Sequence, residues 1–321
     1  MNIPEFLLEV SIVVIAVVSL LTNFSVVLCF TQSTELRSHV PGIFILNLSF
    51  SNILLGVINM PATFLGVAQG VACAETFLTT NAMLSMAALS MDRWLMRHRD
   101  ALLIVAYSWL HSGTFSAVQL LMDWGAFSHT YASCTVHRRA GAGSARGAYA
   151  AFTALFHGSS FAVCLVVLCF AYVKVLRVAR FHCRRIDVIT VQALLLLVDI
   201  HPSVKERCLA QQKKRSQRAT KKIFVFIGSF ILFFSPYVIT RLVELWPSVH
   251  IPRYWGVSSK CLSYAKASTD PFVYCLLRQQ YRRALVSVIC RILRQEHYTL
   301  HSAHSSTLDT TDDNYMVKNC A

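Results

Sequence analysis

Seven long apolar stretches constrain the fold of this chain more than any other feature of its sequence. A helix needs roughly 20 mostly apolar residues to cross the hydrocarbon core of a bilayer, and each stretch is about that long. The stretches are residues 6–30, 41–67, 75–94, 101–122, 148–175, 223–246 and 255–277. The sequence therefore predicts an all-α membrane protein, a seven-transmembrane helix bundle over residues 6–277 that follows a short N-terminal segment, residues 1–5. The first stretch is long enough to serve as an uncleaved anchor, so no cleavable signal peptide is expected.

The basic residues indicate how this bundle is oriented. The chain of 321 residues has a formal net charge of +14, yet only 14% of its residues are charged and 55% are hydrophobic. That balance argues against a soluble nucleic-acid-binding protein, so no nucleic-acid partner is expected. Most of the Lys and Arg residues lie in residues 176–222 and after residue 277. Because cytoplasmic loops are enriched in Lys and Arg, we expect an extracellular N-terminus and a cytoplasmic C-terminus.

The third cytoplasmic loop of this topology, residues 176–222, has an apolar interior. Residues 188–200 form an apolar run of 13 residues between two basic ends. This run is too short to span a bilayer. Two interpretations remain open, namely a helical extension packed below the bundle and a helix that lies on the membrane surface.

The segment after the seventh stretch, residues 278–294, predicts a short amphipathic eighth helix. Its apolar residues recur at steps of three and four, and arginines fill other positions, which is typical of a helix that lies on anionic membrane lipids. Cys290 is either a palmitoylation site or an unmodified thiol. Residues 295–321 are polar and rich in Ser and Thr, so they predict a disordered cytoplasmic tail open to phosphorylation.

Each of the seven stretches carries, within it or at its end, a different short motif or single marker residue. In chain order they are Asn23, Asn52, Asp92-Arg93-Trp94, Trp109, Tyr172, Phe234-Ser235-Pro236, and Asp270-Pro271 followed by Tyr274. Each motif alone has a structural explanation, such as a proline kink or a packed tryptophan. In this order on seven stretches, they resemble the rhodopsin-like (class A) family of G-protein-coupled receptors.

The resemblance implies a plasma-membrane receptor rather than an enzyme, with no cofactor and no metal ion. It implies a heterotrimeric G protein as the partner, and we favour the stimulatory class, which raises cAMP. Arrestin and receptor kinases are further candidate partners at the Ser- and Thr-rich tail. No particular ligand is implied. One alternative is a transporter or channel, but the sequence shows no internal repeat of the kind that such proteins usually have. The other is a signalling-dead membrane protein or shortened splice form that retains or modulates full-length relatives.

The resemblance also assigns roles to individual residues. The G-protein coupling and activation switch comprises Asp92, Arg93, Tyr172, Phe234, Pro236, Asp270, Pro271 and Tyr274. The polar core of the bundle comprises Asn23, Asn52 and Trp109. Proline lacks the backbone N–H of the helical ladder, so the sixth and seventh helices are expected to kink.

Two departures from the family pattern predict high basal signalling. Asn52 replaces the acid that helps hold a sodium ion in relatives, where the ion favours the inactive state, while Asp270 places a carboxylate on the seventh helix. The base of the sixth helix is basic near Ser216 and offers Arg93 no opposite charge. Both changes remove interactions that stabilise the inactive state in relatives, so the active state should be populated without a ligand.

Glu75 marks a candidate ligand pocket, because amine-binding relatives keep an acidic counter-ion there. An ionisable residue within a membrane span is a candidate functional residue. Arg241, Lys260 and Lys266 are available on the sixth and seventh helices, so an internal ion pair and a cationic ligand both remain open.

Two segments are shorter than in the family. The position of the family's third-helix cysteine is Ala68 here, so a disulfide from Cys73 to Cys134 would need an unwound start of the third helix. Arg93 and Trp109 are only 16 residues apart, which leaves almost no second cytoplasmic loop. A splice form and an imperfect gene model both remain open.

Overall fold

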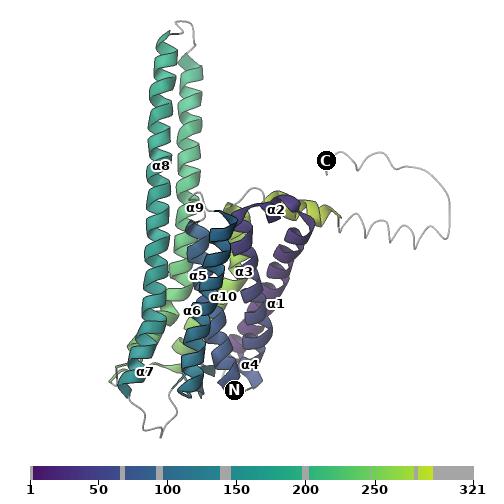
Figure 1. The fold of residues 1–321 in the computed structure, drawn as a ribbon, viewed down its shortest axis with the longest axis vertical. Helices are drawn as coiled ribbons and strands as arrows, with labels where there is room; N and C mark the ends of the chain where they lie inside the picture. Colours follow the sequence, from purple (N-terminus) through teal and green to yellow (C-terminus); the bar gives the residue numbers. More distant parts are fainter. Residues whose placement is uncertain are drawn as a thin grey trace, which may run out of the picture.

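A computed structural model of the chain describes residues 3–65, 69–91, 97–137, 146–196, 202–246, 248–277 and 281–291. The predicted residues Asp92 and Arg93, and the predicted tail 295–321, lie outside the described residues. The helices in chain order are α1 (Ile3–Gln32), α2 (Thr34–Ser38), α3 (Val40–Leu54), η1 (Leu55–Asn59), α4 (Met60–Leu65), α5 (Gln69–Met91), α6 (His98–Leu121), α7 (Arg146–Thr153), η2 (Ala154–Ser159), α8 (Ser160–Leu196), α9 (Pro202–Val243), α10 (Arg253–Leu277) and residues 281–291. The predicted seven-helix bundle is confirmed (Figure 1).

Five helices in the described ranges are long and apolar enough to cross a membrane. They lie at Val10–Gln32, Val40–Ala62, His98–Leu121, Gly147–Val178 and Phe224–Val243. The other two members of the bundle, α5 and α10, carry buried polar residues such as Asn81 on α5 and Lys260 on α10. Those side chains find partners inside the protein, so the two helices need not be apolar on every face.

The centre of the bundle is α5, which packs against α3, α6 and α8. Its small and flexible residues, including Met83 and Met86, lie in the largest apolar core together with Phe226 and Phe230 of α9. Phe161 of α8 stacks on Phe230 with ring centroids 5.4 Å apart. Burial of these side chains holds the helices together near the level where α9 contains Pro236.

Two helices contain π turns that the sequence does not reveal. η1 continues α3, and η2 lies between α7 and α8. A π turn inserts a residue into the helical ladder and bends the helix where no proline does so. The fifth helix lacks the proline usual in the family, and η2 supplies the local irregularity instead.

A small antiparallel hairpin follows α6 and was not predicted. β1 (Gly125–Ser128) pairs with β2 (Ser133–Val136), with Phe127 opposite Cys134. In its turn, Ala132 has a positive φ of 48°, which a non-glycine residue seldom adopts. Every residue of β2 is buried, and both strands contact α5. We call this end of the bundle the hairpin end.

The helices α8 and α9 extend far beyond the opposite end as a long pair (Figure 1). Helix α8 is continuous to Leu196, so most of the apolar run 188–200 continues it. Of the two interpretations, the described part of the run adopts a helical extension, but that extension projects away from the bundle rather than packing below it.

A separate helix over residues 281–291 lies at the same end of the bundle as α2 (Figure 1). It falls within the predicted amphipathic helix 278–294. Tyr281 is buried, and its hydroxyl donates a hydrogen bond to the Val26 carbonyl at 3.2 Å. Its ring lies 5.8 Å from that of Phe30, so the helix is anchored on α1.

Candidate functional site

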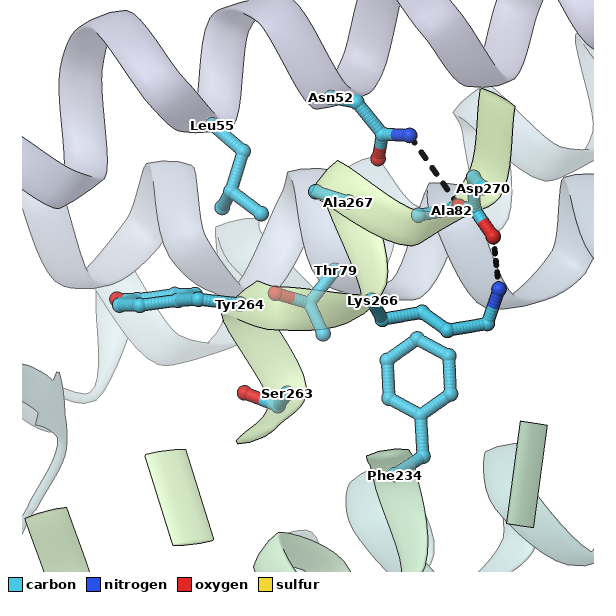
Figure 2. Close-up of a pocket in the computed structure, with 10 residues that line it drawn as sticks. All are labelled: Asn52, Leu55, Thr79, Ala82, Phe234, Ser263, Tyr264, Lys266, Ala267 and Asp270. Carbon is cyan, nitrogen blue, oxygen red and sulfur yellow. Dashed lines mark hydrogen bonds and ion pairs between the residues drawn. The ribbon is translucent and has the colours of Figure 1, made fainter. Parts of the chain in front are cut away.

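A buried ion pair on α10 lies beside Asn52 of α3 (Figure 2). Lys266 and Asp270 are four residues apart on α10, which places both side chains on one face of the helix. The Lys266 ammonium donates a hydrogen bond to the Asp270 carboxylate, and both side chains are 2% exposed. Asn52 of α3 donates to the other carboxylate oxygen at 3.2 Å.

The two predicted core asparagines extend this network to α1. The Asn52 amide also donates to the Asn23 side-chain oxygen at 3.3 Å. The Asn23 amide donates to the carbonyls of Ala267 at 2.9 Å and Ser19 at 2.8 Å. Because each bond is buried, loss of one partner would leave another polar group unsatisfied, so the network fixes α1, α3 and α10 against one another.

A cavity of about 10 Å³ adjoins the ion pair. Its lining includes Asn52, Phe234, Lys266 and Asp270, and Figure 2 shows the Phe234 ring beside the Lys266 side chain. Lys266, which the sequence grouped with Glu75 as a candidate ligand-pocket residue, pairs with Asp270 in the structure. Its spacing of four residues from Asp270 on one helix is the signal that could have found the pair.

A second ion pair lies toward the hairpin end. The Glu75 carboxylate of α5 accepts a hydrogen bond from the Lys260 ammonium of α10 at 3.0 Å, and the side chains are 7% and 3% exposed. Lys260 also donates to the Ser133 hydroxyl of β2. The sequence left an internal ion pair and a cationic ligand open for Glu75, and in the structure Glu75 forms the internal pair.

Arg241 of α9 binds the hairpin from the other side. Its guanidinium pairs with Glu244 at 2.7 Å and donates to the Val136 carbonyl of β2. Tyr131, in the hairpin turn, donates to Glu244 at 3.0 Å, and its ring lies under the guanidinium at 5.1 Å. Burial raises the pKa of the Tyr131 phenol, so this side chain remains a neutral donor. Two of the candidate pocket residues, Lys260 and Arg241, therefore bind the chain's own hairpin.

The switch region is described in part. The rings of Tyr172 and Phe226 lie 5.5 Å apart, and those of Phe230 and Phe234 lie 5.2 Å apart. These aromatic contacts lead along α9 from the Asp270 cavity toward the opposite end of the bundle. The structure places Pro236 within α9 and Pro271 within α10. Asp92, Arg93 and the side chain of Tyr274 lie outside what is described.

The buried polar centre adjoins a column of aromatic rings along α9. Comparison with known proteins identifies the family of this bundle. Residues 22–274 match the family described as 7 transmembrane receptor (rhodopsin family). The chain belongs to this family. It is therefore a multi-pass membrane receptor and not an enzyme.

The receptor is similar to two named members of the family. Human G-protein coupled receptor 26 is 51% identical over 313 residues, which cover 91% of this chain and 91% of the relative. The mouse receptor of that name is 52% identical, over 89% of this chain and 90% of the relative. Human G-protein coupled receptor 78 is 42% identical, over 95% of this chain and 89% of the relative.

The resemblance to this pair of receptors is therefore confirmed. The identity is higher for human receptor 26, at 51%, than for human receptor 78, at 42%.

A further polar network of the receptor was predicted only at Trp109. Its indole donates to the Asn47 side-chain oxygen at 2.7 Å, and Asn47 in turn donates to Ser85 at 2.7 Å. Next to it, Asn81 donates to Ser51 at 2.7 Å and accepts a bond from Ser108 at 2.7 Å. These bonds join α3, α5 and α6. Apolar spans that carry asparagines at internal positions are the sequence signal for such a network.

The candidate disulfide of the receptor is not formed. Cys73 and Cys134 are both free thiols in the structure. Cys73 lies in a regular helix rather than an unwound segment, and its carbonyl accepts a bond from Ser116 of α6 at 2.8 Å. Cys134 is buried in β2, and burial raises the pKa of its thiol.

Among the described residues, no three His, Cys, Asp or Glu side chains group to hold a metal ion.

Proposed function

We propose that this receptor resides in the plasma membrane and activates a heterotrimeric G protein, of the stimulatory class, without requiring a ligand. In this proposal the hairpin end and the N-terminus are extracellular. The α8–α9 extension, the helix 281–291 and the tail are cytoplasmic. The distribution of basic residues supports this orientation.

The observation that carries the proposal is that the chain itself occupies the hairpin end of its bundle. The Glu75 carboxylate, a counter-ion candidate for cationic ligands, is already paired with Lys260 at 3.0 Å. Lys260 in turn donates to Ser133, while Thr135 and Tyr237 are hydrogen-bonded at 3.1 Å. The hairpin thus contacts the sixth and seventh helices, which are the elements that an external ligand would have to bias.

Ligand-independent activity follows if the hairpin favours the signalling arrangement. A ligand shifts an equilibrium only by its differential affinity for two states. A tethered segment is present at a high effective concentration, so its bias on α9 and α10 does not require a free ligand. The sequence supports the same direction, because the basic base of the sixth helix offers Arg93 no restraining carboxylate.

The test is basal cAMP measured against surface expression for the natural chain and for Arg93→Ala. The proposal expects raised cAMP in the natural chain and loss of that rise in the variant at matched surface levels. Background cAMP in both, with the natural chain at the surface, would refute the stimulatory assignment. A panel of G-protein activation sensors then separates another G-protein class from a signalling-dead receptor.

The signalling-dead alternative is supported by one specific observation. Helix α5 ends at Met91 and α6 begins at His98, so few residues join them. The corresponding loop contacts the G protein in relatives, and a short loop removes contact area. In this alternative the chain reaches the membrane, retains or modulates full-length relatives, and activates no sensor in the panel.

The cytoplasmic segments would carry regulation. Cys290 is the proposed palmitoylation site, in the helix that Tyr281 anchors on α1, and palmitate labelling that persists in Cys290→Ser would contradict the assignment. The Ser- and Thr-rich tail is the proposed substrate of receptor kinases and, once phosphorylated, a binding segment for arrestin.

A further inference from the structure

The polar cavity beside Asp270 differs from the ion site of the family in its charges. In relatives an acid on the second helix helps to hold sodium, but Asn52 stands there in this chain. Among the described residues that line the cavity, Asp270 is the one carboxylate. A single carboxylate can balance a single cation.

That single cation is already supplied by the chain. Lys266 is buried, and its ammonium contacts the Asp270 oxygen that Asn52 does not bind. Figure 2 shows the lysine side chain reaching the carboxylate alongside the Phe234 ring. The carboxylate therefore has both oxygens engaged.

Neither the space nor the charge left in the cavity suits a sodium ion in addition to the lysine. The cavity of about 10 Å³ has room for about one water molecule. A metal cation placed there would face the ammonium across a few ångströms in a medium of low dielectric constant, with no second carboxylate to offset the repulsion. The residues present do not fit the ion that the family would lead one to expect.

We propose that Lys266 is the resident cation of this receptor: its ammonium, paired with Asp270, fills the place of the exchangeable sodium ion. The cation is covalently part of α10, so its occupancy does not depend on the ionic composition of either side of the membrane. The receptor is consequently insensitive to sodium, whatever G protein it engages.

The test is thermal unfolding of the purified full-length receptor in detergent, in sodium chloride and in the same concentration of choline chloride. The natural chain is expected to have the same Tm in both salts. Lys266→Asn removes the ammonium, leaves the Asp270 carboxylate and adds an amide oxygen, and oxygen atoms are the ligands that hard cations prefer. This variant is expected to gain a saturable rise in Tm with sodium of about 2–4 °C.

A matched double variant isolates the carboxylate. Lys266→Asn with Asp270→Asn keeps the size of both side chains of the single variant but removes the negative charge. It is expected to unfold at the same Tm in both salts. A sodium response in the double variant would mean that the ion acts elsewhere, which would overturn the proposal.

The natural chain decides the matter even if Lys266→Asn does not fold. A saturable, sodium-specific rise in its Tm would overturn the proposal, since the site would then accept the ion despite the lysine. A folded Lys266→Asn variant without any sodium response would overturn it as well, because the vacated carboxylate should then bind. None of these measurements depends on G-protein coupling, so their failure is distinct from failure of the proposed function.

Discussion

Buried charges are the residues that most distinguish this receptor. Four of them form two ion pairs: Glu75 of α5 with Lys260 of α10, and Lys266 with Asp270, which both lie on α10. A buried ion pair adds little net stability compared with apolar side chains of similar size, but removal of one partner leaves an unpaired charge. The Glu75–Lys260 pair therefore acts mainly by specifying which faces of α5 and α10 meet, and Asp270 does the same for α10 and α3 through its bond from Asn52.

The Glu75–Lys260 pair gives a direct test of this view. Lys260→Met is expected to lower the stability of the receptor by about 3–5 kcal/mol, because the Glu75 carboxylate loses its partner in a buried place. Adding Glu75→Leu should restore most of the loss. Thermal unfolding of the purified receptor measures both, and Lys221→Met, which alters an exposed lysine, is the control. Equal Tm values for the single and double variants would show that the two charges are not coupled.

The assignment of residues to these pairs was only partly predictable from sequence. Glu75 and its three candidate partners could be named because charges are rare in apolar spans. The choice among the partners could not, because it depends on how α10 is rotated. The sequence therefore grouped Lys266 with Glu75, whereas the structure pairs it with Asp270, and their four-residue spacing is the signal for a pair on one helical face.

The hairpin is the element whose role depends most on close packing. Gly256 of α10 lies against the hairpin turn, and a Cβ atom there would overlap the Thr130 carbonyl and approach its methyl group to 2.8 Å. Only glycine allows this approach. The turn is thereby seated on α10, a few residues from Lys260.

Gly256→Ala is therefore expected to displace the hairpin. We expect a loss of stability of about 1–3 kcal/mol from overpacking, and reduced basal cAMP if the hairpin biases α9 and α10. The measurements are thermal unfolding and cAMP at matched surface expression. Gly147→Ala is the matched control, since a Cβ atom there would meet no atom within 4 Å. Unchanged basal cAMP in a stable Gly256→Ala receptor would remove the hairpin from the activation mechanism.

The helices were largely predictable and the other elements were not. Long apolar stretches reveal spans, so the bundle followed from the sequence, and the amphipathic spacing revealed the helix at residues 281–291. The strands β1 and β2 have four residues each, and β2 is buried throughout, so no alternation of polar and apolar residues marks it. The π turns η1 and η2 have no sequence signature of this kind.

The whole molecule has a marked asymmetry between its two ends. One end is closed by the hairpin, and the other carries the long α8–α9 extension (Figure 1). Loop 176–222, which includes this extension, contains many of the basic residues. Because such residues favour the cytoplasmic side, the asymmetry of shape and the asymmetry of charge predict the same orientation.

Epitope tags test that orientation. A tag at the N-terminus is expected to bind antibody on intact cells, whereas a tag after residue 321 should bind only after permeabilisation. A third tag, inserted between residues 138 and 145 near the hairpin, should behave as the N-terminal tag does. Fluorescence of intact and permeabilised cells gives the readout. Staining of the C-terminal tag on intact cells would reverse the proposed topology.

The π turn η2 links the number of residues in the fifth helix to the direction in which its faces point. Each residue advances an α-helix by about 100°, so an extra residue in a regular helix would turn everything before it. The π turn Ala154–Ser159 takes up the extra residue within a single wider turn. His157 and Phe156 are buried within this turn, and His157 packs on Tyr237 with centroids 5.6 Å apart. Because the π turn already holds one extra residue, deleting one residue within it would restore a regular α-helix and change the flanking faces little. Deleting one residue in the regular part of the helix would instead turn everything before it by about 100°. For this receptor, the effect of an insertion or deletion near residue 157 therefore depends on whether the π turn absorbs it.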